Sequence, residues 1–314
     1  MPAYITALMA FSLCLILCPL YIRFSPFGQQ IRLDGPGRHF RKAGTPTMGG
    51  VVFLLSSMLI LLFFVPMTPL LLATLLITLV GGFLGFVDDY RKVARHRSLG
   101  LKARHKLAGQ LIFSLLFYFV LIGYGHSTVV NIPFSGMQVD FGYLYPLLIF
   151  IMIIGTANGV NLTDGIDGLA GGTAILALLA FLTLASQQGL SGLVYFCAIM
   201  IGAVFGFLIF NLHPARVFMG DVGSLSLGTA LAVVAILTKA ELSLVIIGGV
   251  FVLETLSVIL QVISFRLTGR RIFLMSPLHH HFEMKGWSEW HVVTGFWALG
   301  FCFALLGILE YTTL

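Results

Sequence analysis

Long apolar runs take up most of this chain and recur about ten times along its 314 residues. Each run approaches the roughly 20 apolar residues that an α-helix needs to cross a bilayer. Only 10% of the residues are charged, whereas soluble domains carry about 25%. We therefore predict an all-α polytopic membrane protein with about ten transmembrane helices in a single domain, at residues 4–24, 46–65, 70–88, 107–123, 143–160, 169–185, 193–211, 224–238, 243–265 and 291–312.

The basic residues lie almost entirely in alternate connections between these runs. Of the 18 Lys and Arg residues, 17 lie in or beside one set of connections, and only Lys239 lies in the other. Cytoplasmic loops of membrane proteins carry this excess of positive charge. We expect the basic connections to face the cytoplasm and both chain termini to lie outside. Because topology explains the net charge of +6, a nucleic-acid partner is not needed.

One external connection has the pattern of a short β-hairpin. Residues 128–141 form two short segments rich in β-branched and aromatic residues on either side of Ser135-Gly136. Such segments around a glycine-containing turn are typical of paired strands. We expect this hairpin to lie outside the membrane.

The third run ends in two adjacent acids, Asp88 and Asp89, after Gly81, Gly82 and Gly85. Adjacent carboxylates repel each other unless a cation or a proton lies between them. Mg²⁺ prefers oxygen ligands and also binds substrate phosphates, and the glycines allow another backbone to pack closely. The alternative is a solvated stop signal at a helix end.

The fifth run continues into a segment rich in amides and glycine, residues 158–168. If this segment is helical, Asn158, Asn161 and Asp164 share one face. Amides both donate and accept hydrogen bonds, as a nucleotide base or a sugar requires. An ordinary loop would explain the Asp-Gly pairs, but not two asparagines on one face of an apolar helix.

The seventh run ends at Asn211, and Pro214 stops the helix. Asp221 follows near the start of the next run, and a helix N-terminus suits an anion or its metal-bound phosphate. Phe218 is the only aromatic residue of this polar loop. It can stack on a base or serve as a buried anchor of the loop.

The last basic connection contains three consecutive histidines within residues 277–283. Neighbouring side chains of an extended loop cannot all bind one ion, so we expect one or two of them to contact phosphate or move a proton. Glu254 lies inside the ninth run, where a charge usually marks function. The alternative is a satisfied structural polar group.

Five segments, in this order, resemble the phospho-N-acetylmuramoyl-pentapeptide transferase family. They are residues 42–50, 88–90, 158–168, 211–223 and 277–283. The segment from Gly44 to Gly50 and the three histidines favour this family over relatives that transfer N-acetylglucosamine-1-phosphate.

The resemblance implies a multi-pass enzyme of the bacterial cytoplasmic membrane, with its active site facing the cytoplasm. Such an enzyme moves phospho-N-acetylmuramoyl-pentapeptide from UDP-N-acetylmuramoyl-pentapeptide to undecaprenyl phosphate and releases UMP and lipid I, the first membrane step of peptidoglycan synthesis. The resemblance further implies Mg²⁺ as cofactor, a homodimer, and a bent ninth helix that opens a groove for the lipid.

The resemblance also implies roles for single residues. Asp88, Asp89, Asp221 and His280 would be catalytic, with Asp221 as the Mg²⁺ ligand and Phe218 as the uracil platform. Substrate-binding positions would be Lys42, Thr47, Lys92, Lys106, Asn158, Asn161, Asp164, Gly165, Asp167, Asn211, Phe218, Glu254, His279 and His281.

The chemistry leaves two routes open. Phosphoryl transfer depends mainly on positioning and on charge neutralisation. The second pKa of a phosphate is about 6, so the lipid phosphate is mostly dianionic at neutral pH and a general base at Asp88 is optional. We favour direct attack on the β-phosphorus; a covalent intermediate on an aspartate is the alternative.

Three other functions compete with this reading. A sister transferase would move N-acetylglucosamine-1-phosphate to a polyprenyl phosphate. A secondary transporter would need a trail of polar residues that reaches the outside, which the outward half of the chain lacks. A non-catalytic scaffold would not need the acids and amides of the inner face.

Overall fold

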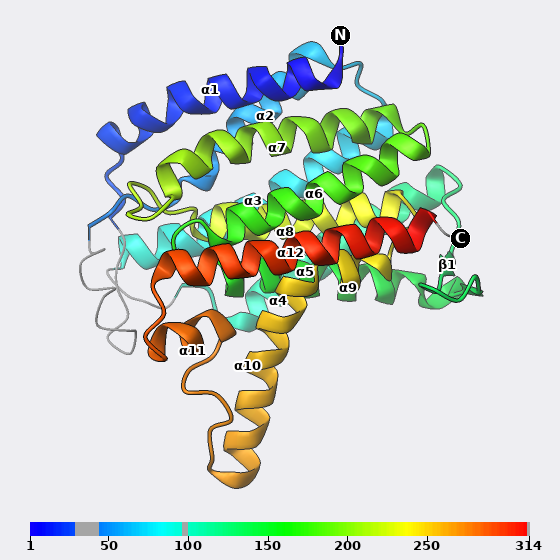
Figure 1. Cartoon of the computed structure of the whole chain (residues 1–314). Coiled ribbons are helices and arrows are strands. Elements are labelled where there is room, and N and C mark those ends of the chain that lie inside the picture. Colours follow the sequence, from blue (N-terminus) through cyan, green and yellow to red (C-terminus); the bar gives the residue numbers. More distant parts are fainter. Residues whose placement is uncertain (29–43, 96–99, 313–314) are drawn as a thin grey trace.

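The computed structural model describes residues 1–28, 44–95 and 100–312, and it is built almost entirely from helices (Figure 1). The described helices that are long and apolar enough to cross a membrane number nine. They are α1 (Ala3–Phe24), α3 (Pro69–Ala94), α4 (Ala103–Gly123), α5 (Tyr145–Thr163), α6 (Leu169–Gln187), α7 (Ser191–Asn211), α8 (Gly220–Leu237), α10 (Gly249–Thr268) and α12 (Glu289–Thr312). The predicted all-α membrane fold is confirmed.

The span predicted at residues 46–65 is a shorter helix, α2 (Gly50–Phe64), of 15 residues. At about 1.5 Å per residue, such a helix is shorter than a hydrocarbon core of roughly 30 Å. The residues before it are not helical because their backbone pairs with the loop before α8. The N–H of Phe218 donates to the carbonyl of Pro46 at 2.8 Å, and the N–H of Gly49 donates to the carbonyl of Phe218 at 2.8 Å.

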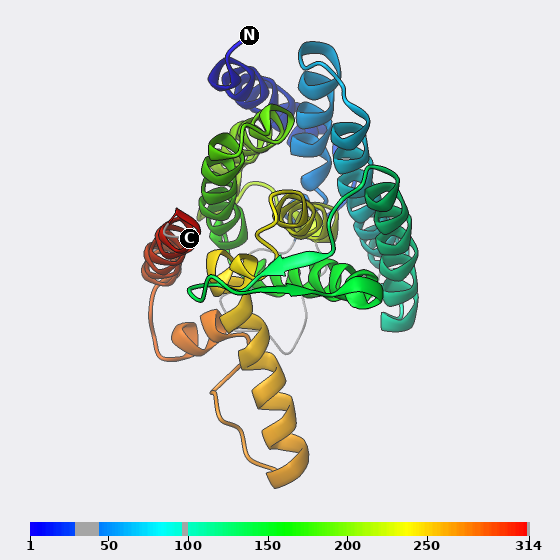
Figure 2. The same ribbon diagram turned by 90° about the vertical axis from the view of Figure 1, so that its right-hand side faces the viewer.

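Helix α8 lies in the middle of the bundle (Figure 2), and all its residues from Val222 to Leu237 are buried. Its neighbours approach closely through glycine. A Cβ atom at Gly85 of α3 would lie 2.1 Å from the carbonyl oxygen of Asp221, and one at Gly50 of α2 would lie 2.3 Å from Cα of Gly223. Close backbone approach at small residues is typical of helix packing in membranes. It brings the end of α3 against the start of α8.

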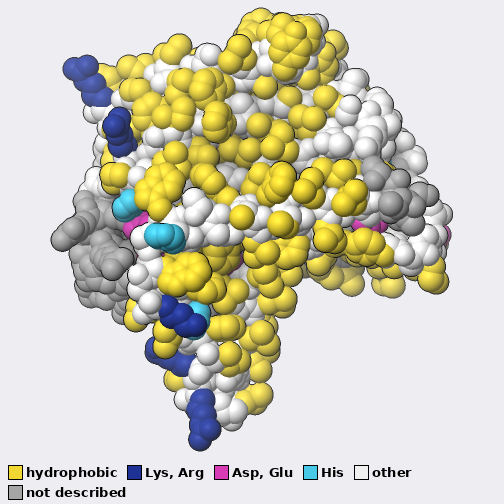
Figure 3. Space-filling view, viewed as in Figure 1, with side chains coloured by type: hydrophobic (Ala, Val, Ile, Leu, Met, Phe, Trp, Pro, Cys, Tyr) yellow, Lys and Arg dark blue, Asp and Glu magenta, His cyan; other side chains and the backbone are white. Residues whose placement is uncertain are grey.

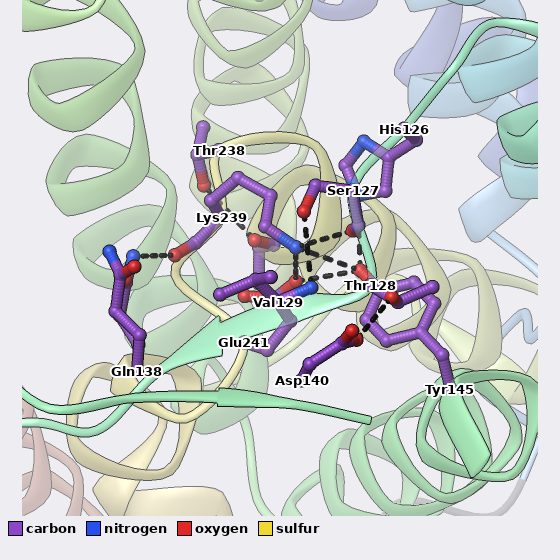
Figure 4. A network of polar contacts seen from close by, with 12 residues as sticks. His126, Ser127, Thr128, Val129, Gln138, Asp140, Tyr145, Thr238, Lys239 and Glu241 are labelled. Atoms are coloured by element: carbon purple, nitrogen blue, oxygen red, sulfur yellow. Dashed lines mark hydrogen bonds and ion pairs between the residues drawn. The ribbon is translucent and has the colours of Figure 1, made fainter. Parts of the chain in front are cut away.

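The predicted hairpin is confirmed as β1 (Val129–Asn131) paired antiparallel with β2 (Gln138–Asp140). Polar contacts fasten it to the connection that follows α8 (Figure 4). The Lys239 ammonium lies 2.6 Å from Oε1 of Glu241 and donates to the carbonyl of Ser127 at 2.9 Å. Both ends of the described chain lie at this end of the bundle, on the right in Figure 1.

The run predicted as one span at residues 243–265 is broken into two helices, which corrects the prediction. The short α9 (Ser243–Ile247) ends at Gly248, and α10 then runs away from the bundle (Figures 1 and 2). At the break, the ring of Phe303 occupies the place that a side chain at Gly249 would fill, 2.6 Å from such a Cβ. Exposed apolar residues along α10 include Leu256, Ile259, Leu260, Ile263 and Phe265.

Hydrophobic side chains cover most of the face shown in Figure 3. Lys and Arg side chains lie at the left-hand end of this face and along the projection formed by α10. A soluble monomer rarely exposes so large an apolar surface. The surface is that of a multi-pass membrane protein.

Candidate active site

Three carboxylates meet where α3 ends and α8 begins. Asp88 and Asp89 lie in the last turns of α3 and are 1% and 4% exposed. Asp221 lies in the first turn of α8, because α8 starts at Gly220 rather than after Gly223. One oxygen of each carboxylate lies within 4.8 Å of the others, a spacing that can hold a metal ion.

Two lysine ammonium groups lie among these carboxylates. Nζ of Lys92 is 2.7 Å from Asp88, 3.1 Å from Asp89 and 3.0 Å from Asp221. Nζ of Lys106, from α4, is 2.7 Å from Asp221 and 3.1 Å from Asp88. This acid cluster (Asp88, Asp89, Asp221, Lys92 and Lys106) therefore combines three acidic with two basic side chains.

Backbone groups fix the orientation of the two carboxylates on α3. Oδ1 of Asp88 accepts the N–H of Leu101 at 2.6 Å, and Oδ2 of Asp89 accepts the N–H of Val222 at 3.2 Å. Gly220 has φ +71°, and a Cβ there would lie 2.5 Å from Oδ2 of Asp89. Glycine at this position meets two requirements, a left-handed backbone and space for the carboxylate.

The amide-rich end of α5 contributes one contact to the acid cluster. Nδ2 of Asn161 donates to Oδ1 of Asp221 at 3.0 Å and to Oγ of Ser224 at 2.8 Å. Asn158 instead donates to the carbonyl of Ile154 at 2.8 Å and contacts Gln110 of α4 at 3.5 Å. The described contacts thus join only one of the two asparagines to the cluster.

Asp164 follows α5 and is half-buried. Loss of hydration, together with the negative charges of Asp221, Asp89 and Asp167, raises the pKa of the Asp164 carboxyl well above its usual range. The Asp164 carboxyl therefore lies close enough to the acid cluster for the negative charges there to raise its pKa. A cation bound between them would lower its pKa again.

Asn211 and Asp167, which we predicted to contact the nucleoside, join loops in this structure. Asn211 accepts the N–H of Gly168 at 3.1 Å and donates to the carbonyl of Val217 at 2.9 Å. Oδ2 of Asp167 accepts the N–H of Ala215 at 3.0 Å. These bonds fix the turn after α5 against the loop between α7 and α8, and the predicted nucleoside contacts stay predictions.

Phe218 is half-buried, and its position follows from the backbone pairing with Pro46 and Gly49 described above. Thr47, in the same segment, is 8% exposed. Its N–H donates to the carbonyl of Phe27 at 2.9 Å. The segment thus places Phe218 beside Thr47. Lys42, which we predicted to bind substrate, lies outside the described residues.

The three histidines lie on a helix, α11 (Leu278–Met284), and not on the extended loop that we expected. Pro277 suits the residue just before a helix, since its missing N–H is not needed there. The three side chains still diverge. His279 is fully buried, Nδ1 of His280 lies 2.7 Å from Glu283, and Nδ1 of His281 accepts the N–H of Leu274 at 3.1 Å.

Glu254, which lies inside the ninth predicted run, contacts one of these histidines. It is fully buried in α10, and its Oε2 lies 3.2 Å from Nδ1 of His279. His279 in turn lies against Gly165 of the turn after α5. Glu254 is thus connected, through α11, to the turn that carries Asp164.

The chain is similar to a known protein family and to several named proteins. The model of the family described as glycosyl transferase family 4 matches residues 70–239. A phospho-N-acetylmuramoyl-pentapeptide-transferase signature matches residues 42–54. Proteins named phospho-N-acetylmuramoyl-pentapeptide-transferase from Anoxybacillus flavithermus and Bacillus subtilis are 53% and 52% identical over 310 residues, which cover 96% of each chain. A protein of the same name from Geobacillus kaustophilus is 52% identical over 306 residues, 95% of this chain and 94% of its own.

The chain belongs to the phospho-N-acetylmuramoyl-pentapeptide-transferase family. The family model covers every residue of the acid cluster and the whole turn after α5. The signature covers Thr47 and the glycines that begin α2. The segment that carries Thr47 lies against the start of α8 and so at the same end of the bundle as the acid cluster, whereas the family model also covers the hairpin at the other end.

Sequence reasoning missed two residues that lie beside Asp167, one of the predicted site residues. Nδ1 of His213 lies 3.0 Å from Oδ2 of Asp167 and 3.3 Å from Oε2 of Glu289, the first residue of α12. These three residues also have the spacing of a metal site, but His213 lies within hydrogen-bonding distance of both carboxylates. His213 belongs to a quoted segment and could have been found from it, whereas no local signal marks Glu289.

Proposed function

We propose that this chain transfers phospho-N-acetylmuramoyl-pentapeptide from UDP-N-acetylmuramoyl-pentapeptide to undecaprenyl phosphate, giving lipid I and UMP. The observation that carries the proposal is the acid cluster, in which three helix-end carboxylates and two lysines meet in a protein whose relatives carry this name. The signature match and the relatives do not favour a sister transferase that moves N-acetylglucosamine-1-phosphate.

The donor set of the acid cluster fits Mg²⁺. Carboxylate oxygens are the ligands that Mg²⁺ prefers, and one oxygen from each of Asp88, Asp89 and Asp221 lies within 4.8 Å of the others. When bound, Mg²⁺ would neutralise charge on the phosphates of the donor. Asp221 is the ligand that we propose first, because it begins α8, where an anionic phosphate is also favoured.

The protein groups around the cluster can position the donor. Lys92 and Lys106 supply positive charge, and rotation of either ammonium away from its carboxylates would let it contact a phosphate oxygen. Phe218 can stack on the uracil, and Asn211 joins the turn from Asp164 to Gly168 to the residue before Phe218. The attacking oxygen belongs to the lipid phosphate, which is mostly dianionic at neutral pH. Direct attack therefore needs no protein base.

The exposed apolar surface along α10 suits the approach of a lipid from the bilayer. We further propose that the acid cluster faces the cytoplasm of a bacterial cell, that the membrane is the cytoplasmic membrane, and that the protein is a homodimer. The 17 to 1 distribution of basic residues supports the orientation.

The test is UMP release by the purified protein in the presence of undecaprenyl phosphate and Mg²⁺. We expect release with UDP-N-acetylmuramoyl-pentapeptide and little with UDP-N-acetylglucosamine. Asp221→Ala should abolish release, whereas Asp140→Ala, at the exposed hairpin, should not. Equal release from both donors, or native activity in Asp221→Ala, would contradict the proposal.

A further inference from the structure

Glu254 of α10 and His279 of α11 are both fully buried and touch each other. Oε2 of Glu254 lies 3.2 Å from Nδ1 of His279, and the backbone N–H of His279 donates to Oε1 of Glu254 at 3.3 Å. Within the described residues, neither ring nitrogen of His279 has a hydrogen-bond partner. The side chains are thus within ion-pair distance but not aligned for a hydrogen bond.

The other edge of the His279 ring lies on the turn after α5. A Cβ atom at Gly165 would lie 2.2 Å from Nε2 of His279 and 2.8 Å from its Cε1. No flexible side-chain end is available to move aside, because the ring is enclosed. Only glycine at residue 165 lets the histidine ring approach the backbone this closely.

A small hydrophobic cluster, separate from the main core, joins the same elements. It contains Ile166 of the turn, Val250 of α10 and Val292 of α12, with Leu278 and Phe282 of α11 packed against it. The turn after α5 therefore shares one packing unit with three consecutive helices that lie far from it in the sequence. A displacement of α11 has to move the turn as well, because close-packed side chains transmit such shifts.

His279 is also in contact with His280, the histidine that we placed in the catalytic group. Their ring centroids lie 4.2 Å apart, and His280 is held on its other side by Glu283 at 2.7 Å. The position of the His280 ring thus depends on that of His279. His280 is half-buried, so it can reach a ligand that the enclosed His279 cannot.

We propose that Glu254 is a positioning residue, which acts through His279 to hold α11 against the turn at Asp164-Gly165. The inference rests on the proposed function and names a role within the same site. Glu254 is fully buried, so it does not contact solvent, and this positioning role replaces the substrate-binding role that the resemblance implied for it. A buried carboxyl group needs a polar partner, which His279 supplies, and the contact fixes where His280 and Asp164 lie relative to the acid cluster.

The first test compares Glu254→Gln with the native protein in UMP release, varying donor and acceptor separately. Glutamine keeps the size but replaces the carboxyl group by an amide. We expect the rate at saturating substrates to fall about 10- to 100-fold, the loss typical of a misplacement near 1 Å, while KM for undecaprenyl phosphate stays within about twofold. Glu241→Gln is the matched control, because it removes a buried carboxylate at the opposite end. It should leave kcat unchanged.

A second test uses the contact with Gly165. Gly165→Ala should slow the reaction because its methyl group displaces His279, and His279→Ala should slow it through loss of the ring. In the double variant the methyl group has room, so its rate should equal that of His279→Ala alone. Losses that multiply, or a native kcat in Glu254→Gln, would overturn the proposal. Absence of UMP release by the native protein would instead remove the proposed function.

Discussion

At the level of single residues, the site depends on groups that hold the carboxylates rather than on the carboxylates alone. Asp88 and Asp89 could be singled out in the sequence because adjacent acids in an apolar chain are conspicuous. Their backbone donors, Leu101 and Val222, could not, because these contacts join residues far apart in the chain. For the same reason the sequence marked Glu254 as a candidate but not its contact with His279.

Replacing Gly220 by alanine should inactivate the protein. The new Cβ would lie 2.5 Å from Oδ2 of Asp89, so the carboxylate has to move. The left-handed backbone adds about 1–2 kcal/mol of strain. Gly189→Ala is the matched control, since Gly189 has φ +69° but no atom within 4 Å of a Cβ. Both variants should melt at lower temperature, and only Gly220→Ala should lose UMP release. Equal activity in the two would show that Asp89 tolerates the displacement.

At the level of elements, hydropathy predicted the long helices because each of them lies in apolar surroundings, and is therefore apolar, along most of its length. It placed the breaks less well. The sequence predicted one span at residues 243–265 and no helix at the histidines, whereas the chain breaks at Gly248 and forms α11. A short helix has little hydrophobic periodicity of its own. It is stabilised by packing against α10 and α12, which local patterns do not reveal.

The hairpin end should lose stability on acidification through His126, whose Nε2 lies 3.0 Å from the Tyr145 hydroxyl. Loss of hydration and the nearby Lys239 lower the pKa of His126 from 6.5 to about 4. Protonation therefore favours the unfolded state, so the stabilisation is complete above pH 6.5 and is lost as pH falls toward 4. Melting curves in detergent between pH 7 and pH 4.5 should show this loss. It should be smaller in His126→Gln and unchanged in His105→Gln, an exposed control; equal slopes in all three would contradict the assignment.

At the level of the whole molecule, the bundle has two unlike ends. One carries the acid cluster and α11, and the other carries both chain ends and the hairpin (Figure 1). The distribution of basic residues over alternate connections predicted this arrangement, because successive helices cross the bundle in opposite directions and their connections therefore lie at alternate ends. It could not anticipate which helix lies at the centre. The burial of α8 follows from small residues on several helices at once, as at Gly85 and Gly50.

Fusions of alkaline phosphatase, which is active only outside the cytoplasm, test the predicted orientation. A fusion after residue 312, beyond α12, should be active. One placed after residue 271, in the basic connection between α10 and α11, should be inactive, and green fluorescent protein at the two positions should give the reverse. An active phosphatase at residue 271 would place the acid cluster on the wrong side for a cytoplasmic nucleotide donor.

The account depends above all on a divalent cation held between the acid cluster and the phosphates of the donor. The most direct measurement replaces Mg²⁺ by Mn²⁺ and records the ³¹P coupling to the metal, by electron–nuclear double resonance, with UDP-N-acetylmuramoyl-pentapeptide bound and no lipid acceptor present. The native protein should show a phosphorus nucleus coupled to the metal, and Asp221→Ala should lose that coupling. A native protein without the coupling, or an Asp221→Ala variant that keeps it, would contradict the account.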